Sequence, residues 1–475
     1  MTRHTKNLGV CTLFCLALSS PAAAMPMADA LASMLEQNER ILAADANVIR
    51  SEYGIDQAFA DFLPTIDLTA SGGYERQIKP TPPNTVAFRN VEGIEVTQKI
   101  YDFGKTGANY EISKLRFYRD KTTSDIVRQT MMLDGIKAYL NVLRAKQGLD
   151  YAIQSESNIK TQTGMEQARV RRGSGLSGDV LQTKSFLAGA MATRVRAEGS
   201  YAIAQNRFIA VFGDEVPLDA LEQPVLPYSK LPKTLNEAMD IAKSNSLTLK
   251  NARTDLMIAR QQLRVAGANM APAISGNAYY KHKSNDAGIM GTKEEMIAKL
   301  DVKYTVYAGG RDRAALSSAR EAVAAAEWQL LDAEHSLEEK VSNAWQNFMT
   351  ARANAQFLRN QSSISGEFLD RAHKERKLGK RSLMDVLNGE TSYINTLSSA
   401  GAAETEMAVA LFSLFESMGA LKPDLFVMPS GAVRIGVESG TQSEEELASE
   451  VFGDEKLSDE GIEAIQEIEG TAATK

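Results

Sequence analysis

The feature that most constrains the fold of this 475-residue chain is an internal repeat. Tyr101-Asp102-Phe103-Gly104 resembles Tyr307-Ala308-Gly309-Gly310, and the two segments lie 206 residues apart. The same spacing separates Asp179-Val180-Leu181 from Asp385-Val386-Leu387. A single spacing kept across so much of the chain is hard to obtain by chance, so the two halves are expected to fold alike.

The repeat divides the chain into five segments. We expect a signal peptide at 1–24, a first structural repeat at 25–213, a proline-rich connector at 214–233, a second structural repeat at 234–422 and an acidic tail at 423–475. The connector holds four prolines, which favours an extended conformation. The tail from Asp424 to Lys475 has 13 acidic and 3 basic residues and few aromatics, so we predict that it is mostly disordered.

The first residues have the composition of a secretory signal. Arg3 and Lys6 form a positive start, Val10 to Leu18 form a short apolar run, and Pro21-Ala22-Ala23-Ala24 offers a cleavage site. A short buried helix is the alternative interpretation. Both cysteines of the chain lie in this segment and neither follows a lipobox-like triplet. We therefore expect a mature chain without disulfide, zinc cluster, cysteine nucleophile or lipid anchor.

Helical patterns open both halves of the chain. They run from about Ala28 to Phe62 and from Thr234 to Met270, and each stops before a proline. Longer helices are predicted from Lys105 to Arg171 and from Arg311 to Lys377, because neither segment contains proline. At about 1.5 Å per residue, each of these helices would be roughly 100 Å long.

Return helices are predicted after glycine-containing turns, from Asp179 to Phe212 and from Leu383 to Met418. An opening helix and a return helix together match the length of the long helix between them. Two short helices stacked end to end can therefore lie beside one long helix. Helical patterns of this length are typical of coiled coils.

Two segments with strand character separate the opening helix from the long helix in each half. The clearest, Met296 to Tyr307, alternates apolar residues with largely polar ones. The others are Val91 to Tyr101, Thr65 to Gln77 and Ala273 to Ser284. Tilted strands of this length can cross an outer membrane with one face in lipid and the other toward a lumen. Two ordinary hairpins packed on a soluble core are the alternative.

A sheet of four strands is too small to close into a transmembrane barrel. An open sheet edge in lipid leaves backbone groups without hydrogen bonds. The membrane interpretation therefore requires several chains that each supply a sector of the barrel. Twelve strands from three chains would leave an open lumen.

The residues around two turns of the second half resemble the TolC family of outer-membrane efflux and secretion proteins. The resemblance rests on Tyr307-Ala308-Gly309-Gly310-Arg311 and on Gly379-Lys380-Arg381-Ser382-Leu383-Met384-Asp385-Val386-Leu387, and it covers residues 28 to 420. It implies a mixed α/β membrane protein. Long antiparallel coiled-coil helices would form an α-barrel tunnel, and each chain would contribute four strands to a shared transmembrane β-barrel.

The same resemblance implies a homotrimeric channel in the outer-membrane lipid of a Gram-negative cell, with a large periplasmic part. Such a channel exports proteins or small molecules together with a periplasmic adaptor and an inner-membrane pump, such as an ABC transporter. We expect type I secretion, because the missing lipobox favours the secretion or multipurpose branch of the family over the lipid-anchored efflux branch. The alternative from another class is a soluble periplasmic coiled-coil scaffold or adaptor, against which the alternating strands argue.

The resemblance also implies candidate gate residues near the periplasmic tip. Asp385 falls at the family's first acidic position and Arg381 at its arginine position. Asn388 stands at the second acidic position and Arg376 replaces the tip tyrosine, so this chain departs from the family at both places. Asp179 is the first-half counterpart of Asp385. Aspartates repeated by symmetry in a narrow pore attract cations.

A capping role is the alternative for both aspartates. Ser382 to Asp385 has the spacing of a capping box, and Asp179 is itself a candidate N-cap. The residues at the two predicted turns are expected to contact an adaptor, with a solvated turn as the alternative. They are Arg171, Arg172, Gly173, Gly175, Gly379 and Lys380.

The sequence offers little for catalysis. His282, His335 and His373 lie in different predicted elements without the spacing of metal ligands. Gly309-Gly310 lacks the motif of a phosphate-binding loop, and no basic block suits nucleic acid. We therefore expect no enzymatic activity, no cofactor, no metal site and no nucleic-acid partner.

Overall fold

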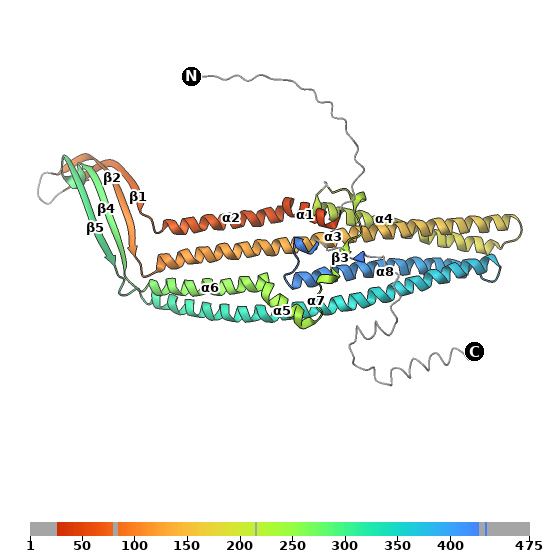
Figure 1. Cartoon of the computed structure of the whole chain (residues 1–475). Coiled ribbons are helices and arrows are strands. Elements are labelled where there is room, and N and C mark those ends of the chain that lie inside the picture. The colour runs from red at the N-terminus through yellow and green to blue at the C-terminus, as the bar shows by residue number, and fades with distance from the viewer. Residues whose placement is uncertain (1–25, 79–83, 214–215, 427–432, 435–475) are drawn as a thin grey trace, which may run out of the picture.

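The computed structural model describes residues 26–78, 84–213, 216–426 and 433–434. They form a long rod with a four-stranded sheet at one end and helices along the rest (Figure 1). The predicted signal peptide and almost all of the predicted acidic tail lie outside the described residues. Residues 79–83, between the first two strands, lie outside them as well.

Each half of the chain supplies the same order of elements. The first half contains α1 (Met27–Gln37), α2 (Glu39–Ala60), β1 (Thr65–Gln77), β2 (Thr85–Tyr101), α3 (Lys105–Arg171) and α4 (Ser177–Phe212). The second contains α5 (Leu235–Asn245), α6 (Leu247–Ala268), β4 (Ala273–Ser284), η3 (Asp286–Gly288), β5 (Thr292–Lys303), α7 (Arg311–Lys377) and α8 (Leu383–Ser417). Short elements connect the halves or follow α8: η1 (Leu218–Ala220), β3 (Val225–Leu226), η2 (Tyr228–Lys230), η4 (Pro423–Phe426) and β6 (Val433–Arg434).

The long helices α3 and α7 have the predicted bounds, but the opening helix of each half is divided. The divisions fall at Asn38 and Ser246, whose ψ angles of 126° and 118° lie outside the helical range. Asn38 Oδ1 accepts a hydrogen bond from the Arg40 N–H, and Ser246 Oγ accepts one from the Leu249 N–H. Both side chains therefore cap the helix that follows them, and this local bonding competes with continuation of the helix before them.

Two strands differ from the prediction. β2 begins six residues before Val91, because its first residues pair with the end of β1. β5 begins and ends four residues earlier than predicted, because Lys303 pairs with Ala273, the first residue of β4. The residues after Lys303 therefore have no partner strand in the described chain.

The main sheet has the strand order β1-β2-β4-β5, and all neighbours are antiparallel. A register shift between Lys99 and Tyr101 ends the regular pairing of β2 with β4 near the helices. β1 and β5 each have one edge without a partner among the described strands. The sheet of a single chain is therefore open on both sides.

The helices continue the sheet as a single layer (Figure 1). Next to the sheet the packing order is α2-α3-α6-α7, and in the far half of the rod it is α4-α3-α8-α7. One edge of the layer is thus formed by β1, α2 and α4, and the other by β5 and α7. Both edges of the helical layer lie on the same sides as the open edges of the sheet.

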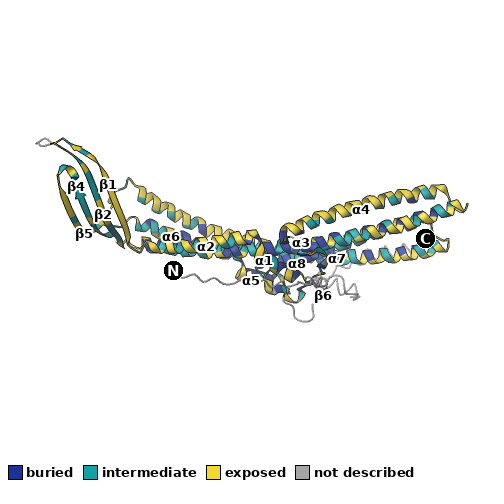
Figure 2. Ribbon diagram, turned by 90° about the horizontal axis from the view of Figure 1, so that it is seen from above, coloured by how far each residue is buried: buried dark blue, intermediate teal, exposed yellow. Residues whose placement is uncertain are grey.

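The main hydrophobic core lies at the middle of the rod (Figure 2), where α1, α5 and the connector pack on the long helices. Tyr139, Phe208, Phe348 and Phe412 are completely buried there. Burial of one such side chain contributes about 1.5–3 kcal/mol. The Tyr139 hydroxyl also donates to the Glu222 carbonyl at 2.8 Å and accepts from the Glu222 N–H at 3.0 Å, which ties the connector to α3.

A small ladder joins the end of the described chain to the connector, because β6 pairs antiparallel with β3. Within the described ranges, every helix is too short or too polar to cross a membrane.

Candidate functional site

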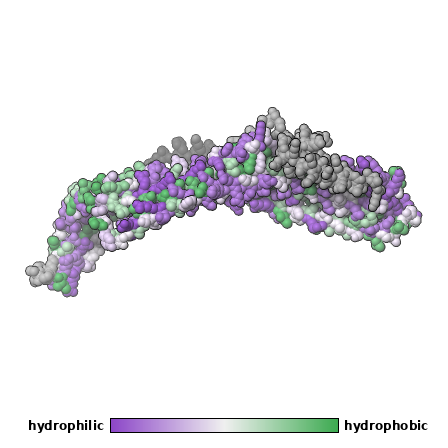
Figure 3. Space-filling view, turned by 90° about the horizontal axis from the view of Figure 1, so that it is seen from below, coloured by the Kyte–Doolittle hydropathy of each residue, from purple (hydrophilic) through white to green (hydrophobic). Residues whose placement is uncertain are grey.

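The two faces of the sheet differ in polarity. Up to the register shift after Lys99, the register sets residues of equal parity opposite one another, so even-numbered residues share one face. This apolar face is covered with exposed hydrophobic side chains: Ile66, Leu68, Tyr74, Val86, Phe88, Ile94, Ile100, Tyr280, Met296, Leu300 and Val302. Leu68 is 85% exposed and Met296 is 84% exposed. Figure 3 shows hydrophobic residues gathered at the sheet end of the molecule. Exposed apolar surface of this extent indicates contact with lipid or protein.

Odd-numbered residues form the opposite, polar face. Charged side chains from all four strands lie on it: Asp67, Glu75, Arg89, Glu95, Lys99, Lys281, Lys283, Lys293, Glu295, Lys299, Asp301 and Lys303. Ion pairs connect neighbouring strands, with Lys281 Nζ 3.6 Å from Glu95 Oε2 and Lys283 Nζ 2.9 Å from Glu295 Oε2. Such a face is suited to water, as in the lumen of a barrel.

Aromatic residues lie at both ends of the strands. At the end of the sheet near the turn between β4 and β5, called here the turn end, the rings of Tyr74 and Phe88 meet edge to face with centroids 5.4 Å apart. At the helix end, Phe62 and Tyr110 meet edge to face at 5.9 Å, and Tyr101 lies 4.8 Å from Phe103. Aromatic girdles at both ends of an apolar band are typical of strands that span a membrane.

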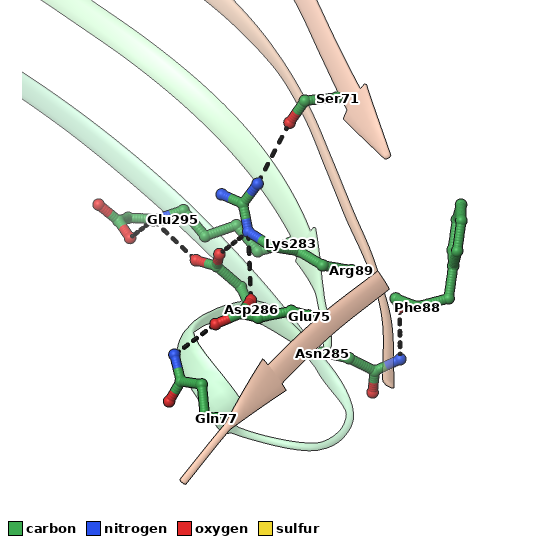
Figure 4. A network of polar contacts seen from close by, with 9 residues as sticks. All are labelled: Ser71, Glu75, Gln77, Phe88, Arg89, Lys283, Asn285, Asp286 and Glu295. Carbon is green, nitrogen blue, oxygen red and sulfur yellow. Dashed lines mark hydrogen bonds and ion pairs between the residues drawn. The ribbon is translucent and has the colours of Figure 1, made fainter. Parts of the chain in front are cut away.

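A network of charged side chains lies on the polar face at the turn end of the sheet (Figure 4). Asp286 lies in η3, between β4 and β5, and its Oδ1 is 2.5 Å from Arg89 Nε on β2. Its Oδ2 is 3.8 Å from Lys283 Nζ on β4, which also pairs with Glu295 on β5. Glu75 on β1 has its Oε2 3.6 Å from Arg89 Nε. This turn-end network therefore connects all four strands.

The open edges of the helical layer expose large hydrophobic side chains. On α4 these are Leu181, Met191, Val195 and Ile203, and on α2 they include Ile49 and Tyr53. On α7, at the opposite edge, they are Trp328, Phe357 and Ile364. Trp328, Phe357 and Ile203 are each 70% exposed. Such surfaces suit contact with another copy of the layer.

The predicted gate residues lie near the tip of the rod opposite the sheet. Asp385 and Asn388 are exposed and three residues apart near the start of α8, so they share one side of that helix. Asp179 lies in the first turn of α4 and is not its N-cap, because that helix begins two residues earlier. The cap of α8 is Ser382, whose Oγ accepts from the Asp385 N–H at 3.1 Å. Among the described residues, nothing bonds to the Asp385 carboxylate itself.

The two predicted gate arginines contact neighbouring residues. Arg376 Nη2 on α7 is 3.0 Å from Glu166 Oε1 on α3, and its Nη1 donates to the Arg381 carbonyl at 3.3 Å. Arg381 Nε is 2.6 Å from Glu375 Oε2, and its guanidinium lies over the ring of Phe368, 5.1 Å from the centroid. The structure thus separates these arginines from Asp385, which they do not contact.

Two buried carboxylates near the tip are not singled out by the sequence. The Glu166 side chain is 5% exposed. It pairs with Arg169 at 3.1 Å and with Arg376 of the other helical hairpin. The Glu390 side chain, also 5% exposed, accepts from Asn158 Nδ2 at 2.7 Å and lies 3.8 Å from His373 Nε2. Both carboxylates therefore connect the α3–α4 hairpin with the α7–α8 hairpin.

The predicted tip residues form two exposed turns. Gly173 and Gly379 have φ angles of 74° and 72°, which glycine adopts without the strain of a side chain. Arg171, Arg172 and Lys380 are exposed, and their side chains have no ion-pair partner in the described chain. Gly175 is partly buried against Val170, which lies 3.1 Å from the position that a Cβ would take. The tip is thus a positively charged surface with free cationic groups.

Two adjoining hollows of about 390 and 370 Å³ lie between α3, α4 and α8. They share Ala152, Thr193 and Arg196 among their lining residues, so they form one shallow groove between the hairpins. In the described part of the chain, no three His, Cys, Asp or Glu side chains are grouped as a metal site would require.

Comparison with known proteins gives a consistent result along nearly the whole chain. The family model described as outer membrane efflux protein matches residues 30–214 and again 238–420. The outer membrane efflux protein BepC of Brucella suis is 21% identical over 396 residues, which are 83% of this chain and 85% of BepC. The outer membrane protein TolC of Vibrio cholerae is 23% identical over 413 residues, which are 85% of this chain and 93% of that protein.

Solved structures show the same fold. The outer membrane channel CmeC of Campylobacter jejuni superposes with a TM-score of 0.74 at 13% identity, over 90% of this chain and 89% of that one. A membrane protein from Pseudomonas aeruginosa superposes with a TM-score of 0.72 at 17% identity, over 83% and 93% of the two chains.

Proposed function

Because the chain belongs to the outer membrane efflux protein family, we propose that it forms a trimeric duct that carries proteins or small molecules out of the cell. Its relatives are channel proteins of the TolC type, and the chain is not an enzyme. The duct would consist of a shared β-barrel in the outer membrane and a tunnel of helices in the periplasm.

The observation that carries this proposal is the sheet with one apolar and one polar face. The strands are 12 to 17 residues long, which exceeds the roughly 9–11 residues that a tilted strand needs to span a membrane. The apolar face, bounded by aromatic residues, suits lipid, and the charged face suits a water-filled lumen. A soluble scaffold would have no use for such an exposed apolar surface.

The open edges support assembly. Unpaired edges of β1 and β5 are not tolerated in lipid, so β5 of one chain must pair with β1 of the next. The helical layer is open on the same two sides and exposes hydrophobic residues there. One rotation can therefore close both the sheet and the helical layer. Three chains would give twelve strands, enough for an open lumen.

The tip would form the periplasmic gate. Asp385 and Asn388 lie on one exposed side of α8, so symmetry copies can face one another across a narrow pore. The contact of Arg376 with Glu166 would hold the hairpins of one chain together, and Arg381 would brace the turn through Glu375. Asp179, in the first turn of α4, would add negative charge to the same entrance.

The proposed partners are a periplasmic adaptor and an inner-membrane pump. The free cations Arg171, Arg172 and Lys380 offer contacts for an acidic partner at the tip, and Gly173, Gly175 and Gly379 shape the turns that present them. The groove between α3, α4 and α8 offers a second contact surface to an adaptor helix.

We propose a pump of the ABC type and protein cargo, as in type I secretion. Small-molecule efflux is the second candidate, favoured by the description of the family and of BepC as efflux proteins. Deletion of the gene distinguishes protein secretion from small-molecule efflux. Loss of a protein from the culture medium with unchanged drug tolerance supports secretion, whereas lowered drug tolerance with unchanged secreted proteins supports efflux.

The first experiment extracts the protein from outer membranes in mild detergent and measures the particle mass after correction for detergent. A mass of three chains supports the shared barrel. A monomer in the soluble periplasmic fraction would contradict the channel and favour a coiled-coil scaffold.

A further inference from the structure

The turn between β4 and β5 leans across the polar face of the sheet. η3 lies beside β2 and also reaches β1, although β2 separates β4 from β1 in the sheet. Asn285 Nδ2 donates to the Phe88 carbonyl at 3.0 Å, so the Asn285 side chain fixes the turn to the backbone of β2. Asp286 then reaches Arg89 and Lys283, which both lie on the polar face (Figure 4). The turn is therefore held toward the polar side of the sheet.

The turn is braced so that it can move as one unit. The Asn285 N–H donates to the Gly291 carbonyl at 2.9 Å, and the Gly291 N–H donates to Asn285 Oδ1 at 3.0 Å. These two bonds close the turn at its base. The contacts that fix it to the other strands are mainly the side chains of Asp286 and Asn285. Loss of the Asp286 contacts would leave the bond from Asn285 to Phe88 as the main remaining tie, and would so loosen the turn without unfolding it.

We propose that this turn is a clasp that narrows the outer mouth of the channel, with Asp286 as its latch and Arg89 and Lys283 as its anchors. This inference rests on the proposed channel, in which the polar face lines the lumen. Rotation about the channel axis places one such turn from each chain at the same height around the mouth. The clasp then sets the size of the solutes that can pass the outer end of the barrel.

The charges explain why the clasp would stay closed at neutral pH. The Arg89 guanidinium beside Asp286 holds the pKa of that carboxyl below its ordinary value, so the latch is ionised. Lys283 is kept in place by Glu295, whose other oxygen accepts from the Tyr279 hydroxyl at 2.9 Å. The Asp286 side chain is 22% exposed and that of Arg89 is 38% exposed, so strong salt is expected to weaken the contact.

The test measures passage through the mouth with a cysteine reporter deeper in the barrel. Ser275 lies on the polar face near the helix end of β4, where it pairs with Lys99 and Asp301. In Ser275→Cys, a small maleimide and a large polyethylene-glycol maleimide are added to intact cells. We expect the small reagent to label quickly and the large one slowly.

Release of the latch should change only the largest size of reagent that can enter the barrel from outside. Asp286→Asn and Arg89→Gln should each raise the labelling rate of the large reagent severalfold and leave that of the small reagent unchanged. Asp67→Asn is the matched control, because it removes the same charge from the polar face of β1 near the helix end of the sheet, away from both the latch and the reporter. An unchanged size limit in Asp286→Asn and Arg89→Gln would overturn the clasp.

A second reporter separates failure of the clasp from failure of the channel. Leu300→Cys lies on the apolar face and should stay unlabelled in every background if that face is in lipid. Equal labelling of Leu300→Cys and Ser275→Cys would contradict the barrel itself. Labelling of Ser275→Cys alone, with the same size limit in all latch variants, would leave the barrel intact and disprove the clasp. The particle mass in detergent confirms that each variant assembles.

Discussion

Arg376 on α7 and Glu166 on α3 form an ion pair with 3.0 Å between Nη2 and Oε1, and this pair joins the two helical hairpins of one chain near the tip. The Glu166 side chain is 5% exposed and that of Arg376 is 24% exposed. A carboxylate buried this deeply depends on its partners, because water no longer stabilises its charge. Separation of the hairpins would break the pair, so in the proposed gate the pair would favour the closed state.

Arg376→Ala should open the tip. The variant leaves Glu166 with Arg169 as its remaining ion-pair partner and removes a contact between the hairpins, so the open state gains population. We expect a severalfold higher mean conductance of the purified channel in planar bilayers. Lys374→Ala is the matched control, since Lys374 pairs with Asp370 in the same helix and does not join the hairpins. Equal conductance of wild type and Arg376→Ala would show that the pair does not restrain the tip.

The roles of gate and cap at the start of α8 can be separated. Ser382 provides the capping oxygen and Asp385 provides the charge. Ser382→Ala should lower the free energy of unfolding by about 1 kcal/mol and leave ion selectivity unchanged. Asp385→Asn retains the backbone N–H that bonds Ser382, so it should lower the preference for cations with little effect on stability. Measurement of reversal potentials and thermal unfolding for both variants tests this assignment. Unchanged selectivity in Asp385→Asn would exclude a gate role for this aspartate.

The burial of Tyr139 should make the middle of the rod sensitive to alkali. Burial raises the pKa of Tyr139 to about 12 from an ordinary value of 10.0. Because the folded state holds the phenol proton more tightly, the stabilisation that Tyr139 provides is fully present below pH 10. It is lost as the pH rises toward 12, which lowers the free energy of unfolding by up to about 2 kcal/mol. We expect thermal stability to fall across this range in the wild type and to fall less steeply in Tyr139→Phe.

The Phe variant also has a direct effect at neutral pH. It removes the hydroxyl that bonds both backbone groups of Glu222, so we expect the free energy of unfolding at neutral pH to fall by about 1–2 kcal/mol. Tyr151→Phe is a suitable control at neutral pH, because among the described residues its hydroxyl bonds the side chain of Gln147 on the same helix. Parallel pH profiles for wild type and Tyr139→Phe would disprove the role of this phenol.

Local signals in the sequence predict most of the fold. The bounds of α3 and α7 follow from proline-free segments between glycines at Gly104, Gly173, Gly310 and Gly379, all with positive φ. Alternation predicts the two faces of the sheet correctly. The bounds of β5 do not follow from alternation, because they depend on where its partner β4 begins and ends.

The site is harder to predict, because it depends on contacts between distant residues. Arg89 and Asp286 are 197 residues apart in the chain, and no local pattern relates them. Glu390 looks like an ordinary helix glutamate, although its spacing from the buried Val386 and Leu387 places it on the packed side of α8. That spacing is the signal in the sequence that identifies it as buried.

The two faces of the sheet give the most direct test of membrane insertion. Leu68 and Thr69 are neighbours on β1 that point to opposite faces, and both are exposed in the single chain. Leu68→Arg places a charge on the apolar face, which costs about 2–4 kcal/mol per chain near the middle of a bilayer. Thr69→Arg places the same charge on the polar face, where the lumen supplies water. We expect Leu68→Arg to reduce the amount of assembled protein in the outer-membrane fraction severalfold and Thr69→Arg to leave it near the wild-type amount. Equal loss in both variants would indicate a general folding defect, and equal tolerance would show that the apolar face does not lie in lipid.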